Sequence, residues 1–202
     1  YKLGLLSKGH FVEVSRTDLI AGYQGQTALK VKKVIEKALG GVLFIDEAYS
    51  ITENENSDSY GRECLTELTK ALEDYRDNLV VIVAGYTEPM KQFFESNPGL
   101  KSRFNTFITF EDYNGDELFK IFEKMCKEDD YEMSSEIVAG LKEIFNEKGN
   151  SHIQNFSNGR FVRNLYENMV MNHARRVMCI VDPTLNQLRL FEKEDVPTRN
   201  TL

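Results

Sequence analysis

The stretch of sequence that decides the fold reads Gly41-Val42-Leu43-Phe44-Ile45-Asp46-Glu47-Ala48. Its four consecutive apolar residues, Val42 to Ile45, are typical of a strand that is buried on both faces of a parallel sheet. Two adjacent carboxylates, Asp46 and Glu47, follow at the carboxyl end of this strand, where open α/β sheets bind their ligands. Neighbouring residues of an extended chain point in different directions, so one carboxylate can hold Mg²⁺ while the other orients a water.

This arrangement is that of the Walker B motif of P-loop ATPases, with Asp46 as the magnesium ligand and Glu47 as the base that activates water. Taken alone, the same residues also fit a solvated loop that follows a core strand, because an apolar run before Asp-Glu is not rare by chance. The spacing to the other elements of the chain therefore decides between the two interpretations.

Strands and helices alternate in the first half of the chain, which indicates an α/β fold with a parallel sheet flanked by helices. We expect strands at residues 11–14, 42–45, 79–84 and 106–110, and helices at 26–39, 62–75 and around 90–94. After Asp112 the strand signal stops, and helical periods follow at 118–125, 137–145 and 162–169. The sequence therefore predicts an α/β domain at residues 1–112 and a helical domain with a C-terminal tail at 113–202.

Charge and composition exclude several classes of partner. The 202 residues carry 25 Lys and Arg against 32 Asp and Glu, for a net charge of −7. Because both halves are acidic, binding to a nucleic-acid backbone is disfavoured. No apolar run approaches the ~20 residues of a membrane span. The three cysteines lie far apart and suit a reducing compartment, without a disulfide framework or a zinc site, so we expect a cytoplasmic protein.

In combination, the motifs resemble the AAA+ ATPase family, specifically the group that contains the red-type rubisco activase (CbbX-like) and stage V sporulation protein K. The resemblance extends to about Cys179. The matching segments are residues 5–10, 12–16, 22–27, 40–49, 80–86, 96–103 and 158–160. The resemblance implies a P-loop ATPase core followed by a small all-helical lid.

The resemblance also implies two arginines at the nucleotide. Arg103, which follows Asn-Pro-Gly-Leu-Lys-Ser, matches the arginine finger, whose permanently charged planar guanidinium reaches the γ-phosphate of a neighbouring subunit. The alternative is a surface arginine at the start of the next strand. Arg160 matches the sensor 2 arginine of the lid, with Arg163 as second choice, although Asn158-Gly159 also suits an ordinary helix start.

Two further segments carry over from the family. Tyr23-Gln24-Gly25 matches the pore loop, whose aromatic side chain grips a threaded polypeptide; without that context the segment is merely a turn. The sensor 1 position, where many relatives have Asn, reads Ala84-Gly85-Tyr86-Thr87 here. Either Tyr86 or Thr87 would have to make the polar contact to the nucleotide.

The largest departure from the family is the P-loop itself. The chain contains no G-x-x-x-x-G-K-[ST], the segment that supplies the amide cradle and the lysine for the phosphates. In the family this segment lies shortly before the part that matches Leu5-Leu6-Ser7. We therefore expect the first strand and the P-loop to be cut off from this chain rather than mutated.

The resemblance implies a chaperone-like motor that binds ATP and Mg²⁺, assembles into a homo-hexameric ring, and remodels or threads a protein client. The alternative is a non-catalytic assembly or interaction module that keeps the AAA+ shape. The set of Asp46, Glu47 and Arg103 favours the ATPase, whereas the missing P-loop favours the module. A DNA-remodelling protein is disfavoured by the acidic charge.

Overall fold

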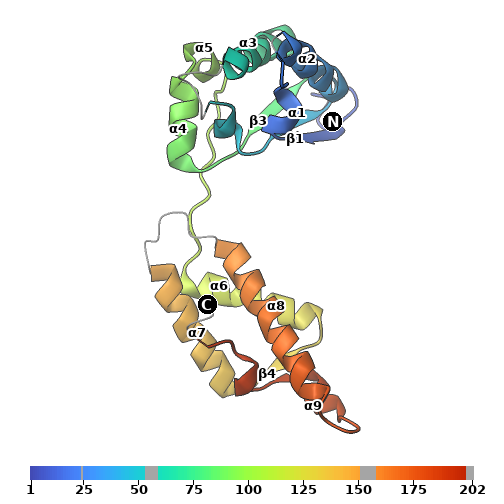
Figure 1. The fold of residues 1–202 in the computed structure, drawn as a ribbon, viewed down its shortest axis with the longest axis vertical. Coiled ribbons are helices and arrows are strands. Elements are labelled where there is room, and N and C mark those ends of the chain that lie inside the picture. Colours follow the sequence, from blue (N-terminus) through green and yellow to red (C-terminus); the bar gives the residue numbers. More distant parts are fainter. Residues whose placement is uncertain (24, 53–58, 151–157, 199–202) are drawn as a thin grey trace. The chain divides into compact units, whose positions relative to one another are not determined.

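We describe a computed structural model of the chain, which covers residues 1–23, 25–52, 59–150 and 158–198. The chain separates into two compact units, Tyr1–Thr109 and Phe110–Leu202 (Figure 1). Each unit has a hydrophobic core of its own. No helix within the described residues is both long and apolar enough to cross a bilayer.

A parallel three-stranded sheet forms the centre of the first unit. Its strands are β1 (Phe11–Val14), β2 (Val42–Ile45) and β3 (Val80–Val83), in the order β1-β2-β3. The parallel pairing on both sides of β2 confirms the predicted α/β class. The apolar strand that precedes the two carboxylates is thus the central strand of the three.

Two helices, α2 (Gln26–Ala38) and α3 (Ser59–Asp74), lie side by side and pack against the sheet (Figure 1). Their apolar residues recur at helical spacing and bury Leu43 and Ile45 of β2 almost completely. The remaining elements of this unit are short: α1 (Arg16–Leu19), η1 (Ala48–Ile51), α4 (Thr87–Glu95) and α5 (Pro98–Lys101).

The strand predicted at residues 79–84, observed as β3, is buried on one face only. Val81 and Val83 pack on the core, whereas Val80 and Ile82 are exposed. Successive side chains of a strand point to opposite faces of a sheet, and α2 and α3 cover only one of them. The exposed side chain of Phe11 lies on the same open face, opposite Val42 and Val80 in the register.

The prediction of a strand at residues 106–110 is wrong. This segment has no regular structure, and Phe110 is 91% exposed. A strand requires a partner edge, and none of the described residues pairs with this segment. The ring of Phe107 instead packs edge-on against Phe94 of α4, with 5.2 Å between the ring centroids.

The helices predicted for the second unit are present as its longest described elements: α6 (Gly115–Glu128), α7 (Ser135–Asn150) and α8 (Asn158–Val177). Asn114 caps α6 reciprocally, because its side chain accepts from the Glu117 amide and the Glu117 carboxylate accepts from the Asn114 amide, each at 3.0 Å. The core lies between the three helices. The unit is not wholly helical, because β4 (Glu132–Met133) and β5 (Leu190–Phe191) form a short parallel pair.

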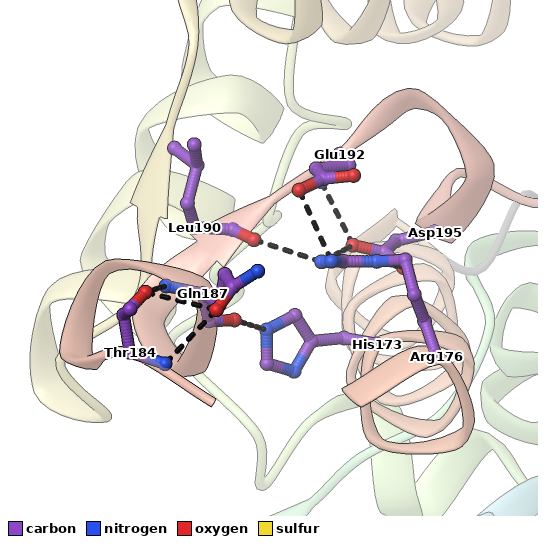
Figure 2. Close-up of polar contacts among 7 residues, drawn as sticks. All are labelled: His173, Arg176, Thr184, Gln187, Leu190, Glu192 and Asp195. Carbon is purple, nitrogen blue, oxygen red and sulfur yellow. Dashed lines mark hydrogen bonds and ion pairs between the residues drawn. The ribbon is translucent and has the colours of Figure 1, made fainter. Parts of the chain in front are cut away.

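The segment after α8, which contains α9 (Leu185–Arg189) and η2 (Lys193–Asp195), is fastened to that helix by polar contacts (Figure 2). Arg176 Nε and Nη2 donate to the Asp195 carboxylate at 3.0 and 2.9 Å, and Nη2 also donates to the Leu190 carbonyl at 3.0 Å. His173 Nε2 donates to the Gln187 carbonyl at 3.1 Å. Asp195 is fully buried, so this ion pair lies in the interior of the second unit.

Candidate functional site

The candidate site lies at the carboxyl edge of the sheet. The three strands end level with one another, because Ile45 at the end of β2 lies opposite Val14 on one side and Val83 on the other. Residues that follow parallel strands meet at this edge, the position at which open α/β sheets bind ligands. The structure therefore brings the carboxylates that follow β2 close to the residues that follow β3.

The turn that carries the two carboxylates is fixed to both neighbouring strands. The Asp46 amide donates to the Val14 carbonyl and the Ala48 amide donates to the Ala84 carbonyl, each at 3.0 Å. Between them Glu47 has a left-handed backbone, with φ 47° and ψ 46°. This conformation is uncommon for a residue with a side chain, and such strain, of order 1–3 kcal/mol, gathers at functional sites.

The carboxylate of Asp46 suits a magnesium ion that is shared with a phosphate ligand. Its Oδ1 accepts the Glu47 amide at 3.0 Å, and both carboxylates are exposed. Among the residues described, no three His, Cys, Asp or Glu side chains gather as a metal cage. Mg²⁺ usually keeps several waters and binds one or two carboxylates plus substrate phosphates, so a single exposed carboxylate fits this type of site.

The residues after β3 approach the same turn. A Cβ atom at Gly85 would lie 2.7 Å from Cδ1 of Tyr49, so only glycine allows Tyr49 to pack there. Tyr49 belongs to η1, which begins directly after Glu47, and its ring lies 6.3 Å from that of Tyr86. Tyr86 precedes α4 and Thr87 is its first residue, so both sensor 1 candidates stand at this edge of the sheet.

Arg103 follows the single turn of α5. Asn97 begins this turn, and its Oδ1 accepts the Gly99 amide at 2.8 Å. The Arg103 guanidinium donates from Nη1 to the Gly99 carbonyl at 2.9 Å and lies with Nε 3.4 Å from Oε2 of Glu73 on α3. The alternative interpretation placed Arg103 at the start of a strand at residues 106–110. The structure has no strand in this segment.

Tyr23 lies in the connection between α1 and α2. Its side chain is 74% exposed. Gly25 caps α2 with a left-handed backbone, φ 78°, which favours glycine. Gln24, the middle residue of the predicted pore loop, lies outside the described residues.

Arg160 and Arg163 both lie exposed near the start of α8, in the second unit. The first residue of this helix, Asn158, makes hydrogen bonds to the segment that precedes α6. Its Oδ1 accepts from the Tyr113 amide at 3.0 Å, and its Nδ2 donates to the Asp112 carboxylate. Asn158 therefore fixes the start of α8 two residues before Arg160.

Sequence reasoning missed two features of this site. The left-handed backbone of Glu47 has no signal in the sequence, because no glycine marks it. Glu73, the partner of Arg103, lies 30 residues earlier at the end of a predicted helix, where an exposed glutamate is ordinary. Only the packing of α5 against α3 brings the two side chains together.

Comparison with protein families yields two matches that together cover nearly the whole chain. The model of the ATPase family associated with various cellular activities (AAA) matches residues 3–112. The model of the AAA lid domain matches residues 114–201.

Individual relatives agree with these matches. The chain is 41% identical to protein CbbX of Cereibacter sphaeroides, over 97% of this chain and 63% of the relative. It is 40% identical to a CfxQ homolog of Trieres chinensis, over 97% and 67%, and 41% identical to stage V sporulation protein K of Bacillus subtilis, over 88% and 55%. The chain thus spans about 55% to 67% of the length of these relatives.

Solved structures agree on the fold. The crystal structure of the FIGL-1 AAA domain superposes with a TM-score of 0.60 at 17% identity, over 91% of this chain and 58% of that chain. A second structure of the same domain, in complex with ADP, superposes with a TM-score of 0.57 at 19% identity, over 82% of this chain and 52% of that one.

Proposed function

Since the chain belongs to the AAA family of ATPases and carries the lid of that family, we propose that it acts in the Mg-ATP-dependent remodelling or threading of a protein client. The observation that carries the proposal is the turn of Asp46 and Glu47 at the carboxyl edge of the central strand. Its backbone is strained and is held by hydrogen bonds to both neighbouring strands, as expected of a functional turn.

In this proposal each residue of the edge has one role. Asp46 is the protein ligand of Mg²⁺, which would neutralise charge on the phosphates. Glu47 accepts the proton of the attacking water. Tyr86 or Thr87 contacts the nucleotide from the end of β3, and Arg160 contacts it from the lid.

The remaining predicted residues act between molecules. We propose a cytoplasmic homo-hexameric ring, in line with the tendency of AAA proteins to assemble into rings. Arg103 then acts on the nucleotide of a neighbouring subunit, and the loop of Tyr23, Gln24 and Gly25 contacts the client. The exposure of Tyr23 supports this role, because a gripping side chain must be accessible.

A second candidate function is a non-catalytic assembly module of AAA shape. The 202 residues of the chain contain no G-x-x-x-x-G-K-[ST], so on their own they are also compatible with such a module. ATP turnover by the full-length gene product separates the two candidates, because the module hydrolyses no ATP.

The decisive experiment measures ATP turnover of the full-length gene product and two variants. Glu47→Gln keeps the shape of the side chain but removes the base, so turnover should fall by about 10²- to 10⁴-fold while ATP still binds. Glu95→Gln, an exposed glutamate at the end of α4, is the matched control and should turn over normally.

Mixing variants tests the trans role of Arg103. Arg103→Ala should be inactive alone, yet a mixture with Glu47→Gln should recover some turnover. An intact Glu47 on one subunit then faces an intact Arg103 on its neighbour. Normal turnover of Glu47→Gln would contradict its role as base, and no recovery at any mixing ratio would contradict the trans role.

A further inference from the structure

The guanidinium of Arg103 is held by two groups of its own subunit. Nε lies 3.4 Å from Oε2 of Glu73, and Nη1 donates to the Gly99 carbonyl at 2.9 Å. The side chain of Arg103 is only 31% exposed, although it stands at the end of a short surface helix. Within the described residues, Nη2 has no hydrogen-bond partner, so its two N–H groups are free for an anion.

The acceptor at Gly99 is rigid and shaped for this contact. Asn97 fixes the Gly99 amide, and the next residue, Leu100, anchors α5 in the core. A Cβ atom at Gly99 would lie 3.2 Å from Cγ2 of Thr69 and 3.4 Å from Nη1 of Arg103. The missing side chain therefore leaves room for α3 and for the guanidinium together.

Glu73 stands on a helix that the core holds in place. Leu68 and Ala71 of α3 are buried in the core, so the last turn of α3 has a fixed position. Glu73 offers Oε2 to Arg103, while its Oε1 lies 3.9 Å from Nη1 of Arg76. Glu73 thus has an arginine near each carboxylate oxygen, with the shorter distance to Arg103.

We propose that Glu73 is the positioning residue of Arg103, an assignment that rests on the proposed role of Arg103 as arginine finger. With the Gly99 carbonyl it orients the guanidinium and leaves Nη2 free for a phosphate group of the nucleotide bound by a second copy of this chain. A guanidinium held in advance loses less rotamer freedom when it binds. An exposed ion pair is weak, so Glu73 can hold Arg103 without competing with a phosphate.

The contact itself is tested in the 202-residue chain, without any activity. The Nε–H resonance of Arg103 is assigned by its disappearance in Arg103→Lys. Glu73→Ala should shift this resonance, because the carboxylate 3.4 Å from Nε is lost. Glu73→Gln, which removes the same charge, should shift it in the same direction. Asp74→Ala, which removes a charge from the next residue, should leave it unchanged. An unchanged resonance in Glu73→Ala would overturn the proposal.

The consequence is tested by ATP turnover of the full-length gene product. Glu73→Ala should lower kcat about two- to five-fold, the range that an exposed ion pair can supply, and leave KM within about twofold. Glu73→Gln, which also removes the charge, should lower kcat in the same direction, and Asp74→Ala should match the unchanged protein. A kcat that stays constant or rises in Glu73→Ala would overturn the proposal. If Arg103→Ala retains full turnover, the arginine finger fails instead, whatever the resonance shows.

Discussion

Two aromatic residues of the first unit have opposite environments. Tyr23 is 74% exposed in the connection before α2, whereas Phe93 of α4 is 1% exposed. The ring of Phe93 packs edge-on against Phe94, with 5.2 Å between the centroids. Removal of a buried ring leaves a cavity, while removal of an exposed one leaves only solvent. The stability cost of substitution therefore separates a core aromatic from one kept at the surface for contact.

Tyr23→Ala should change the free energy of unfolding by no more than ~0.5 kcal/mol, because surface substitutions rarely cost more. The full-length gene product that carries it should keep its basal ATPase and lose remodelling of a protein client. Phe93→Ala is the control and should cost ~3–5 kcal/mol. Urea unfolding and a client-unfolding assay measure the two effects. A large loss of stability in Tyr23→Ala would assign the residue to the core and remove the argument for threading.

Among the helices and strands, the sequence predicted the ones whose residue pattern lies within a single segment of the chain. The apolar run of β2 and the helical periods of α6, α7 and α8 each fall within one segment, and each was predicted from it. The segment at residues 106–110 has the same β-type residues, yet forms no strand, because pairing depends on a partner edge elsewhere in the chain. The pair of β4 and β5 was missed for a related reason: two residues show no periodicity.

The same distinction holds for the candidate site. The place of Asp46 and Glu47 after an apolar strand could be read locally, and the family resemblance supplied roles for Arg103 and Arg160. The contact between Arg103 and Glu73 could not be read, because it depends on how α5 packs against α3.

The ion pair of Arg176 and Asp195 joins the helix α8 to η2. The Asp195 carboxylate raises the pKa of the Arg176 guanidinium through its hydrogen bonds, and Asp195 itself is fully buried. Loss of Arg176 would leave the buried Asp195 carboxylate without a counter-ion, whereas loss of Asp195 would leave Arg176 with Glu192, whose Oε1 lies 3.1 Å from its Nη1. Removal of both would avoid that penalty, so the two residues should be coupled.

Arg176→Met should therefore destabilise the second unit by ~3–5 kcal/mol, because Asp195 loses its partner. The double variant Arg176→Met with Asp195→Leu should lose less than the sum of the two single variants. Arg175→Met, at the neighbouring exposed position, is the control and should stay within ~0.5 kcal/mol. Urea unfolding followed by near-ultraviolet circular dichroism measures these values. Additive losses would show that the pair is not coupled.

At the scale of the whole molecule, each unit contains one buried thiol: Cys64 in the first and Cys126 in the second. Burial raises the pKa of each to about 12, so neither is a thiolate at neutral pH. Cys179 is exposed. Since the thiolate is the reactive form, the three cysteines should differ in their reaction with a thiol reagent.

With a disulfide reagent at pH 8, one thiol of the native chain should react fast, and Cys179→Ser should abolish that reaction. Cys64 and Cys126 should react only when their units unfold, so mass spectrometry of labelled peptides reports each unit separately. Fast labelling of Cys64 in the native chain would contradict its burial.

The two buried thiols also make stability depend on pH. Because the folded-state pKa of these two thiols lies above the unfolded value of about 8.5, their contribution to stability is complete below pH ~8.5 and is lost as the pH rises towards 12.

The 202-residue chain should bind Mg-ATP weakly. Asp46 can hold the metal, but the sequence lacks the amide cradle and the lysine that would hold the phosphates. Loss of several charge-assisted hydrogen bonds, each worth ~1.5–3 kcal/mol, weakens binding by orders of magnitude. Titration calorimetry of this chain that showed micromolar affinity would contradict the prediction.

The fastening of the segment after α8 has a consequence for chain cleavage. Met178 and Val181 lie exposed in the connection that follows α8. The contacts of Arg176 with Leu190 and Asp195 join α8, before this connection, to the segment after it. A protease that cuts this connection severs the backbone but none of those contacts. The released peptide, which contains β5 and η2, should therefore stay bound as a non-covalent complement of the lid. Size-exclusion chromatography should return both fragments in one peak until urea separates them.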